Sequence, residues 1–446
     1  MTDTSLPGGP QRSWAETVRV YFTPVMLSML ILGFASGLPL YMVFQKLSFW
    51  LRDAGIERST IGFFYWVTLS YTFKFLWSPI VDRVKIPLLH KMLGPRRSWI
   101  VTAITGTVIG LIIISQTDPT QGLLPVAIGA ILLSYSGATL DVAIDAWRIE
   151  SAPNRMQANM AAAYSLGYRV AYMTSGLGLA ISAWADWDIS FLAMAAAMAL
   201  SAVLVFYMKE PATGIAKREL EGGFATKVVM SVWEPFKQIF SRLKLWIIPV
   251  ILLVMIYRLS DFTMGVMASP LYSDIGFDRA IVGGVQGGPG LASTIFGLFI
   301  GGVAVFRFGL MRALVIGLVI TFITNGAYAW LAATAGPEDV WKLTVAIVGD
   351  NLAGGFVTTA FIAYLSSLVD PANAATQYAL LSSFYAFVAK FLSGFSGLLA
   401  DAVGYFNFFL ITAAWTIPAA LLLWFILMFG TEDAKGKHTF AERETI

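Results

Sequence analysis

Long apolar segments separated by short polar intervals recur along nearly the whole chain. Each segment is long enough to cross the hydrocarbon core of a bilayer as a helix, which takes about 20 residues. The pattern predicts an all-α polytopic membrane protein with twelve transmembrane helices, at residues 25–48, 59–81, 97–115, 122–147, 158–184, 189–208, 245–272, 280–305, 310–332, 340–368, 377–402 and 406–430.

The longest polar interval follows the sixth predicted helix and is rich in Lys, Arg and Glu. Such an interval is the natural boundary between two groups of helices. The sequence therefore predicts an N-terminal segment, a first six-helix half, a central loop, a second six-helix half and a tail, at residues 1–24, 25–208, 209–244, 245–430 and 431–446.

Basic residues in the loops predict the orientation of these helices. If the N-terminus is cytoplasmic, the inner segments hold most of the loop Lys and Arg, and the outer loops hold only Arg52, Arg58, Arg279 and Lys342. Positively charged loops remain on the cytoplasmic side of a membrane. We therefore expect both termini in the cytoplasm. Residues 1–24 are polar and do not resemble a cleavable signal peptide.

An internal repeat indicates that the two halves are related. The stretch from Pro153 to Ser165 resembles the stretch from Pro371 to Ser383, and at the same offset Ser175-Gly176 matches Ser393-Gly394 and Gly137 matches Gly355. Chance similarity between helices rich in Ala, Ser and Gly is the alternative, but it does not account for a shared offset at three places. Two pseudo-symmetric, parallel six-helix halves around a central site describe the major facilitator fold.

Composition agrees with a membrane protein and offers no cofactor chemistry. The chain is 57% hydrophobic and 13% charged, whereas about a quarter of the residues in soluble domains are charged. It has no cysteine, and its only histidines, His90 and His438, fall in a loop and the tail, so we expect no metal site and no cofactor. The net charge of +3 resides in the loops. The expected partners are the lipid bilayer and a small molecule, not nucleic acid, and the expected oligomeric state is a monomer.

Two carboxylates near the inner end of the fourth predicted helix are the candidates for proton coupling. Asp141 and Asp145 are four residues apart and share a helix face, with Arg148 one turn further. Carboxylates at membrane depth are costly and usually face water or a basic partner. Asp141 is deeper, and a carboxylate that alternates between water and a cation can bind and release a proton. For Asp145 and Arg148, an ion pair that caps the helix remains an equal alternative.

The same two carboxylates do not predict an enzyme. An intramembrane aspartyl protease needs two carboxyls that converge to share a proton. Asp141 and Asp145 on one helix do not converge in this way, so we expect no catalytic residues.

Charged residues near the predicted midplane are the candidates for substrate binding. Arg169 and Lys390 lie on the repeated stretches, and Arg258 and Asp261 are three residues apart on one face of the seventh helix. Several cations suit a substrate with carboxylates or phosphates. The alternative is internal pairing, of Arg169 with Asp141 or Asp145 and of Arg258 with Asp261. The further candidates are polar or aromatic residues of neighbouring helices: Lys74, Gln45, Tyr65, Tyr71 and Asn351.

The loop between the second and third predicted helices carries the candidates for a gate. Asp82 and Arg83 end the second helix, and Arg96 and Arg97 begin the third. Together with Arg148, these charges are expected to hold the two halves together on the inner side in one state. Basic residues that merely follow the topology rule are the alternative for the arginine cluster.

Several short motifs resemble those of AmpG-type muropeptide permeases, a family of the major facilitator superfamily. The similarity extends from about residue 25 to 430. It is carried by Gly33-Phe-Ala-Ser-Gly-Leu-Pro-Leu40, Thr60-Ile-Gly-Phe-Phe64, Phe73-Lys-Phe-Leu-Trp-Ser-Pro79, Arg96-Arg-Ser-Trp99, Asp141-x-x-x-Asp-Ala-Trp147, Leu166-Gly-Tyr-Arg169, Asn351-Leu-x-Gly-Gly355 and Ala375-Thr-Gln-Tyr-Ala-Leu-Leu381. The chain departs from the family pattern at Leu140, where Gln is common, and at Gln286-Gly287, where an Asn-Lys pair is common.

The resemblance implies a bacterial inner-membrane transporter that imports N-acetylglucosamine–anhydro-N-acetylmuramyl peptides with the proton gradient as its energy source. These products of cell-wall turnover feed peptidoglycan recycling and β-lactamase induction. The nearest alternative is a proton-coupled importer of a siderophore or another peptide-like anion, and an intramembrane enzyme is a remote one. A sensor without transport activity would need a soluble receiver domain, which the sequence does not contain.

Overall fold

The computed structural model describes residues 23–151, 154–211, 237, 241–369 and 374–436, apart from a few side chains within helices. In the described part of the first half, the first predicted span consists of α2, η2 and α3, and the second is divided into short pieces. The bounds are α2 Pro24–Tyr41, η2 Met42–Lys46, α3 Leu47–Asp53, α4 Arg58–Phe64, η3 Tyr65–Thr68, α5 Leu69–Phe73, η4 Lys74–Leu76, α6 Ser78–Arg83, α7 Leu89–Leu93, α8 Pro95–Ser115, α9 Leu123–Ser151 and α10 Asn154–Val205.

The second half contains the same kind of helices, several of them interrupted. Its elements are η5 Lys244–Trp246, α12 Ile247–Ile256, α13 Leu259–Ile275, α14 Arg279–Val285, η6 Gln286–Gly290, α15 Leu291–Phe308, α16 Leu310–Thr334, α17 Val340–Ser367, α18 Ala374–Ser393, α19 Ser396–Ala414 and α20 Thr416–Phe429.

Proline and positive backbone angles account for several of the interruptions. Pro39 lies shortly before the π-helical turn η2, and Pro289 lies within η6. A proline inside a helix removes one N–H donor and disturbs the regular hydrogen-bond ladder. Asp186, with φ of 69°, interrupts α10, and Gly404, with φ of 75°, interrupts α19. Each of these two long helices therefore turns sharply and contributes to two spans.

The described elements are consistent with the twelve predicted helices. Nine helices in the described ranges are long and apolar enough to cross a membrane by length and composition. Both the fifth and sixth predicted helices lie in α10, and the eleventh continues from α18 into α19 as far as Gly404. The central loop lies mostly outside the described residues. The domain division therefore remains a prediction.

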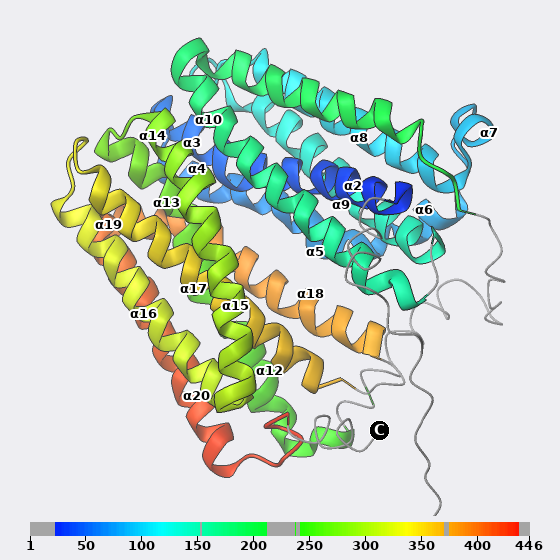
Figure 1. Cartoon of the computed structure of the whole chain (residues 1–446). Coiled ribbons are helices and arrows are strands. Elements are labelled where there is room, and N and C mark those ends of the chain that lie inside the picture. The colour runs from blue at the N-terminus through cyan, green and yellow to red at the C-terminus, as the bar shows by residue number, and fades with distance from the viewer. Residues whose placement is uncertain (1–22, 152–153, 212–236, 238–240, 370–373, 437–446) are drawn as a thin grey trace, which may run out of the picture.

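The helices of the two halves converge at one end of the bundle. Figure 1 shows α3 and α4 of the first half beside α13, α14 and α19 of the second, while the other ends of the two groups diverge. We call this the closed end, defined by Arg52, Arg58, Asp274 and Asp401. From the loop charges, we expect this side to lie outside the cytoplasm.

Glycines permit the close approach of the two halves near the closed end. Gly62 of α4 lies against the backbone of Gly394 and Gly397, and a Cβ atom at Gly397 would overlap the backbone of Arg58. Gly176 of α10 and Gly283 of α14 meet in the same way. Small residues at a helix contact let backbones pack closely, which is how helices associate in lipid.

Replacing Gly397 with Ala should push α4 and α19 apart. A membrane-impermeant maleimide should then label a cysteine introduced at Ser59 severalfold faster in the G397A background. The label reports one position because the chain contains no cysteine. Gly326→Ala is the matched control, since a Cβ atom there meets nothing within 4 Å. Equal labelling rates in the two backgrounds would contradict the packing argument.

Candidate functional site

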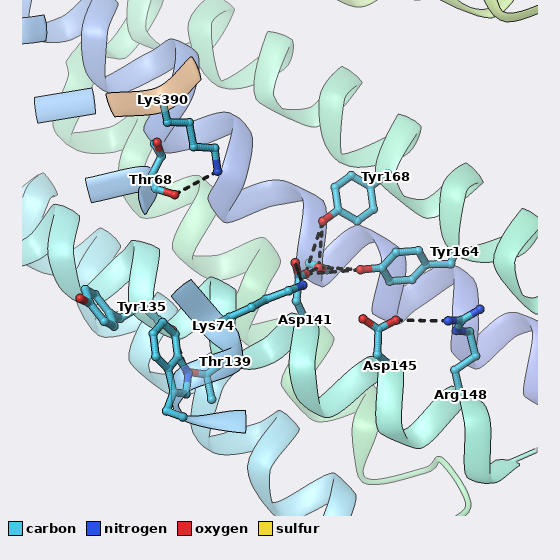
Figure 2. Close-up of polar contacts among 12 residues, drawn as sticks. Thr68, Lys74, Tyr135, Thr139, Asp141, Asp145, Arg148, Tyr164, Tyr168 and Lys390 are labelled. Atoms are coloured by element: carbon cyan, nitrogen blue, oxygen red, sulfur yellow. Dashed lines mark hydrogen bonds and ion pairs between the residues drawn. The ribbon is translucent and has the colours of Figure 1, made fainter. Parts of the chain in front are cut away.

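Asp141 of α9 is the centre of a polar cluster inside the first half (Figure 2). Its Oδ2 lies 3.1 Å from the ammonium of Lys74. Its Oδ1 accepts a close hydrogen bond from Ser36 and longer ones, of 3.4 Å, from the phenols of Tyr164 and Tyr168. The Tyr164 hydroxyl also donates to Ser36 over 2.9 Å. A charge-assisted bond and three hydroxyls thus replace the water that the carboxylate loses on burial.

Local helix packing brings these groups together. Gly33 of α2 lies against the backbone of Tyr164, and Gly167 of α10 lies against the backbone of Leu30. The two helices are therefore close enough for Ser36 to reach both tyrosines. Tyr164 and Tyr168 are four residues apart, so both phenols point from one face of α10 towards α9.

The alternative in which Arg169 pairs with Asp141 or Asp145 is wrong, and a role of Arg169 in substrate binding remains a prediction. In the structure Asp141 pairs with Lys74, which we had expected to bind substrate. Consecutive residues of a helix point about 100° apart. Because Tyr168 faces Asp141, its neighbour Arg169 faces elsewhere.

Asp145 forms the local ion pair that we had considered as an alternative. Its Oδ1 lies 3.4 Å from Arg148, three residues on, and 52% of the Asp145 side chain is exposed. The carboxylate of Asp141 is 12% exposed by the same measure. The two aspartates therefore occupy different environments, and Asp141 is the buried one.

The second half contains another internal pair, between Arg258 and Asp261. Arg258 Nε lies 3.3 Å from Asp261, and Arg258 Nη1 donates to the hydroxyl of Thr358 over 3.2 Å. Each charged side chain is 18% exposed. On α17, the amide of Asn351 donates to the carbonyl of Ile347 and accepts from Thr294. The substrate-binding roles of Arg258, Asp261 and Asn351 remain predictions.

The remaining residues that are predicted to bind substrate lie on or near the second span. Lys390 of α18 lies over the ring of Tyr71, with its ammonium 5.6 Å from the ring centroid. Tyr65 is buried edge-on against Phe44, with centroids 4.8 Å apart, and its role in substrate binding remains a prediction. Gln45 lies half-buried in the π-helical turn η2.

The predicted gate residues make contacts within the first half. Arg96 pairs with Glu150 over 2.6 Å, and Arg97 lies 3.4 Å from Glu210, which also accepts from the backbone N–H groups of both arginines. The side chains of Asp82 and Arg83 lie outside the described part of the structure. These contacts join helices of one half, and a role in holding the two halves together remains a prediction.

An ion-pair network that the sequence reasoning missed joins the halves at the closed end. Asp274 of α13 accepts from Arg52, from Arg58 over 3.1 Å and from Tyr405 over 2.8 Å. Two further pairs, of Arg58 with Asp401 over 3.5 Å and of Arg279 with Asp53 over 2.8 Å, complete it. Every ion pair between described residues that connects the two halves belongs to this network. Arginines in otherwise poorly basic outer loops were the signal available in the sequence.

Comparisons with known proteins agree with this architecture. The family model of the Major Facilitator Superfamily matches residues 25–389 and, in a second match, 250–445. The anhydromuropeptide permease of Escherichia coli K12 is 32% identical over 414 residues, which is 92% of this chain and 81% of that one. A putative transporter, AmpG 4 of Rickettsia conorii, is 30% identical over 404 residues, 90% of this chain and 96% of that one.

Among solved structures, the chain is similar to a bacterial homologue of the human lysosomal transporter Spinster in an inward-facing, unoccupied conformation. The TM-score is 0.66 at 13% identity, and the match covers 93% of this chain and 97% of that one. At this identity the likeness concerns the fold alone.

Breaking the Lys74–Asp141 pair on one side should cost more than removing both charges. Lys74→Met leaves a carboxylate without its cation and should lower the free energy of unfolding by on the order of 1–3 kcal/mol. In the double variant Lys74→Met/Asp141→Leu, part of this loss should be recovered, because no unpaired charge remains. Thermal unfolding of the purified protein in detergent measures both. Additive losses in the double variant would argue against a coupled pair.

Proposed function

The chain belongs to the AmpG-type permease family of the major facilitator superfamily, and on this basis we propose that it imports anhydromuropeptides across the bacterial inner membrane together with protons. It is a multi-pass membrane transporter and not an enzyme. In this proposal the proton gradient drives the import, and the transporter needs no cofactor. Uptake of these cell-wall fragments would serve peptidoglycan recycling and, through it, β-lactamase induction.

The observation that supports proton coupling is the environment of Asp141. This carboxylate is mostly buried, and a single cation and three hydroxyls hold it. Lys74 itself retains 31% exposure, so the pair is not sealed from the space around it. A carboxylate that gains or loses its cationic partner as the helices move changes its affinity for protons. Asp141 therefore serves as the coupling residue, with Lys74 as its partner.

The cations of the bundle support an anionic cargo. Arg169, Arg258 and Lys390 come from three different helices; Arg258 already pairs with Asp261, and Lys390 lies over the ring of Tyr71. Guanidinium groups bind carboxylates through two parallel hydrogen bonds. A disaccharide peptide offers several carboxylates, together with sugar rings that can stack on aromatic side chains.

With both termini in the cytoplasm, the closed end faces the periplasm. The ion pairs between Arg52, Arg58 and Asp274 then close the outer side, and the diverging helix ends face the cytoplasm. This arrangement corresponds to the state from which a cargo is released inward. The transporter acts as a monomer, because one chain supplies both halves.

Uptake into proteoliposomes tests the proposal. Labelled N-acetylglucosamine–anhydro-N-acetylmuramyl tripeptide should accumulate severalfold above its external concentration when the lumen is alkaline, and a protonophore should abolish the accumulation. Absence of uptake, or uptake indifferent to the gradient, would refute the assignment. In the same assay, displacement by a ferric siderophore but not by unlabelled disaccharide peptide would favour the siderophore alternative.

A further inference from the structure

Lys390 is a buried cation at the contact between the two halves. The residue is 7% exposed, and its side chain extends from α18 towards the second span (Figure 2). In the described part of the chain, its ammonium donates one hydrogen bond, to the backbone carbonyl of Thr68 over 3.1 Å. The ammonium also lies 5.7 Å from the centroid of the Phe44 ring. An ammonium has three donors, and a carbonyl and two ring faces do not neutralise its charge.

The second span, which Lys390 contacts at the Thr68 carbonyl and the Tyr71 ring, carries three hydroxyls without a described hydrogen-bond partner. They belong to Thr68, Tyr71 and Thr72, and all three oxygen atoms are buried. Residues spaced by three and four share one face of a helix. By contrast, Ser70 on another face of the same helix bonds to Ser134 over 2.7 Å. Buried hydroxyls normally have partners, and these three can donate to the oxygens of a polar ligand.

The charges in this region do not balance. Lys74 lies on the same span, two residues after Thr72, and pairs with Asp141. Asp141 is already engaged by Lys74 and by three hydroxyls on its other side. Lys390 forms no ion pair with any described residue, so its charge is left without an anion. A buried ammonium without an anion is costly, and an anionic group from outside the protein would stabilise it.

We infer that Lys390 and the hydroxyls of Thr68, Tyr71 and Thr72 form a binding site for a carboxylate group of the transported molecule. This inference rests on the proposed function and specifies which part of the cargo binds there. One carboxylate oxygen pairs with the ammonium, and the hydroxyls donate to the remaining lone pairs. Because Lys390 belongs to the second half and the hydroxyls belong to the first, a bound carboxylate connects both halves. The site is separate from Asp141, which stays available for the proton.

Matched cargoes with and without the carboxylates test the inference. One is the disaccharide tripeptide, and the other is the same molecule with its carboxylates converted to carboxamides. We expect Lys390→Met to weaken binding of the carboxylate form at least tenfold and to leave the carboxamide form within twofold of wild type. Lys390→Arg should retain most of the preference. Equal weakening of both forms by Lys390→Met would overturn the inference, since a purely structural lysine predicts that result.

Lys46 provides the matched control. It is also a buried lysine, and its ammonium donates to the side chain of Gln286 over 3.2 Å, so a neutral acceptor already engages it. Lys46→Met should therefore change the binding of both cargo forms alike. If it removes the carboxylate preference as strongly as Lys390→Met does, the preference is not specific to Lys390 and the inference is wrong.

A smaller probe separates this inference from the proposed function. N-acetyl-D-alanine at millimolar concentration should protect the wild-type protein from thermal unfolding, whereas N-acetyl-D-alaninamide should not, and Lys390→Met should abolish the difference. If neither disaccharide peptide binds but this difference is observed, the proposed cargo is wrong and the carboxylate site stands. If the two small probes protect wild type equally, the carboxylate site is refuted whatever the larger cargoes do.

Discussion

The free-energy cost of burying a carboxylate inside a membrane protein determines how the helices of the first half pack. Asp141 can remain charged at that depth only if cations and hydroxyls replace its water. Lys74 comes from the second span, Ser36 from α2, and Tyr164 and Tyr168 from α10, so one side chain on α9 fixes the mutual positions of four spans. The glycine contacts between α2 and α10 serve the same arrangement, because they bring Ser36 and the phenols within reach.

The interactions that join the two halves are individually weaker than those around Asp141. The ion pairs of the closed end are partly exposed, from 21% at Asp274 to 39% at Asp401. Exposed ion pairs contribute about 0–1 kcal/mol each. A network of such pairs, together with the close glycine packing of Gly62 and Gly397, holds the halves together without making their separation prohibitive. This is the balance that a transporter needs, since the same end must open to admit a cargo.

Hydrophobic patterning predicted the class of fold, because long apolar segments and loop charge are local properties of the sequence. Asp141 was also identifiable, since a carboxylate within an apolar segment is rare. Its ion-pair partner, Lys74, could not be identified from the sequence. Lys74 lies in a second span whose 3₁₀ turns shift the directions of the side chains, and a regular helix pattern does not reveal this shift. The network around Asp274 was missed because its members lie in different loops and meet only when the halves pack. The repeat predicted related halves but not which of their residues touch.

In the proposed mechanism, Asp141 couples proton movement to transport and is not merely a structural ion. Counterflow in proteoliposomes separates these roles, because exchange of labelled for unlabelled cargo needs no net proton movement. We predict that Asp141→Asn retains exchange and loses accumulation driven by a proton gradient, while Asp145→Asn, at the exposed pair, retains both. Accumulation by Asp141→Asn at the wild-type level would contradict the account.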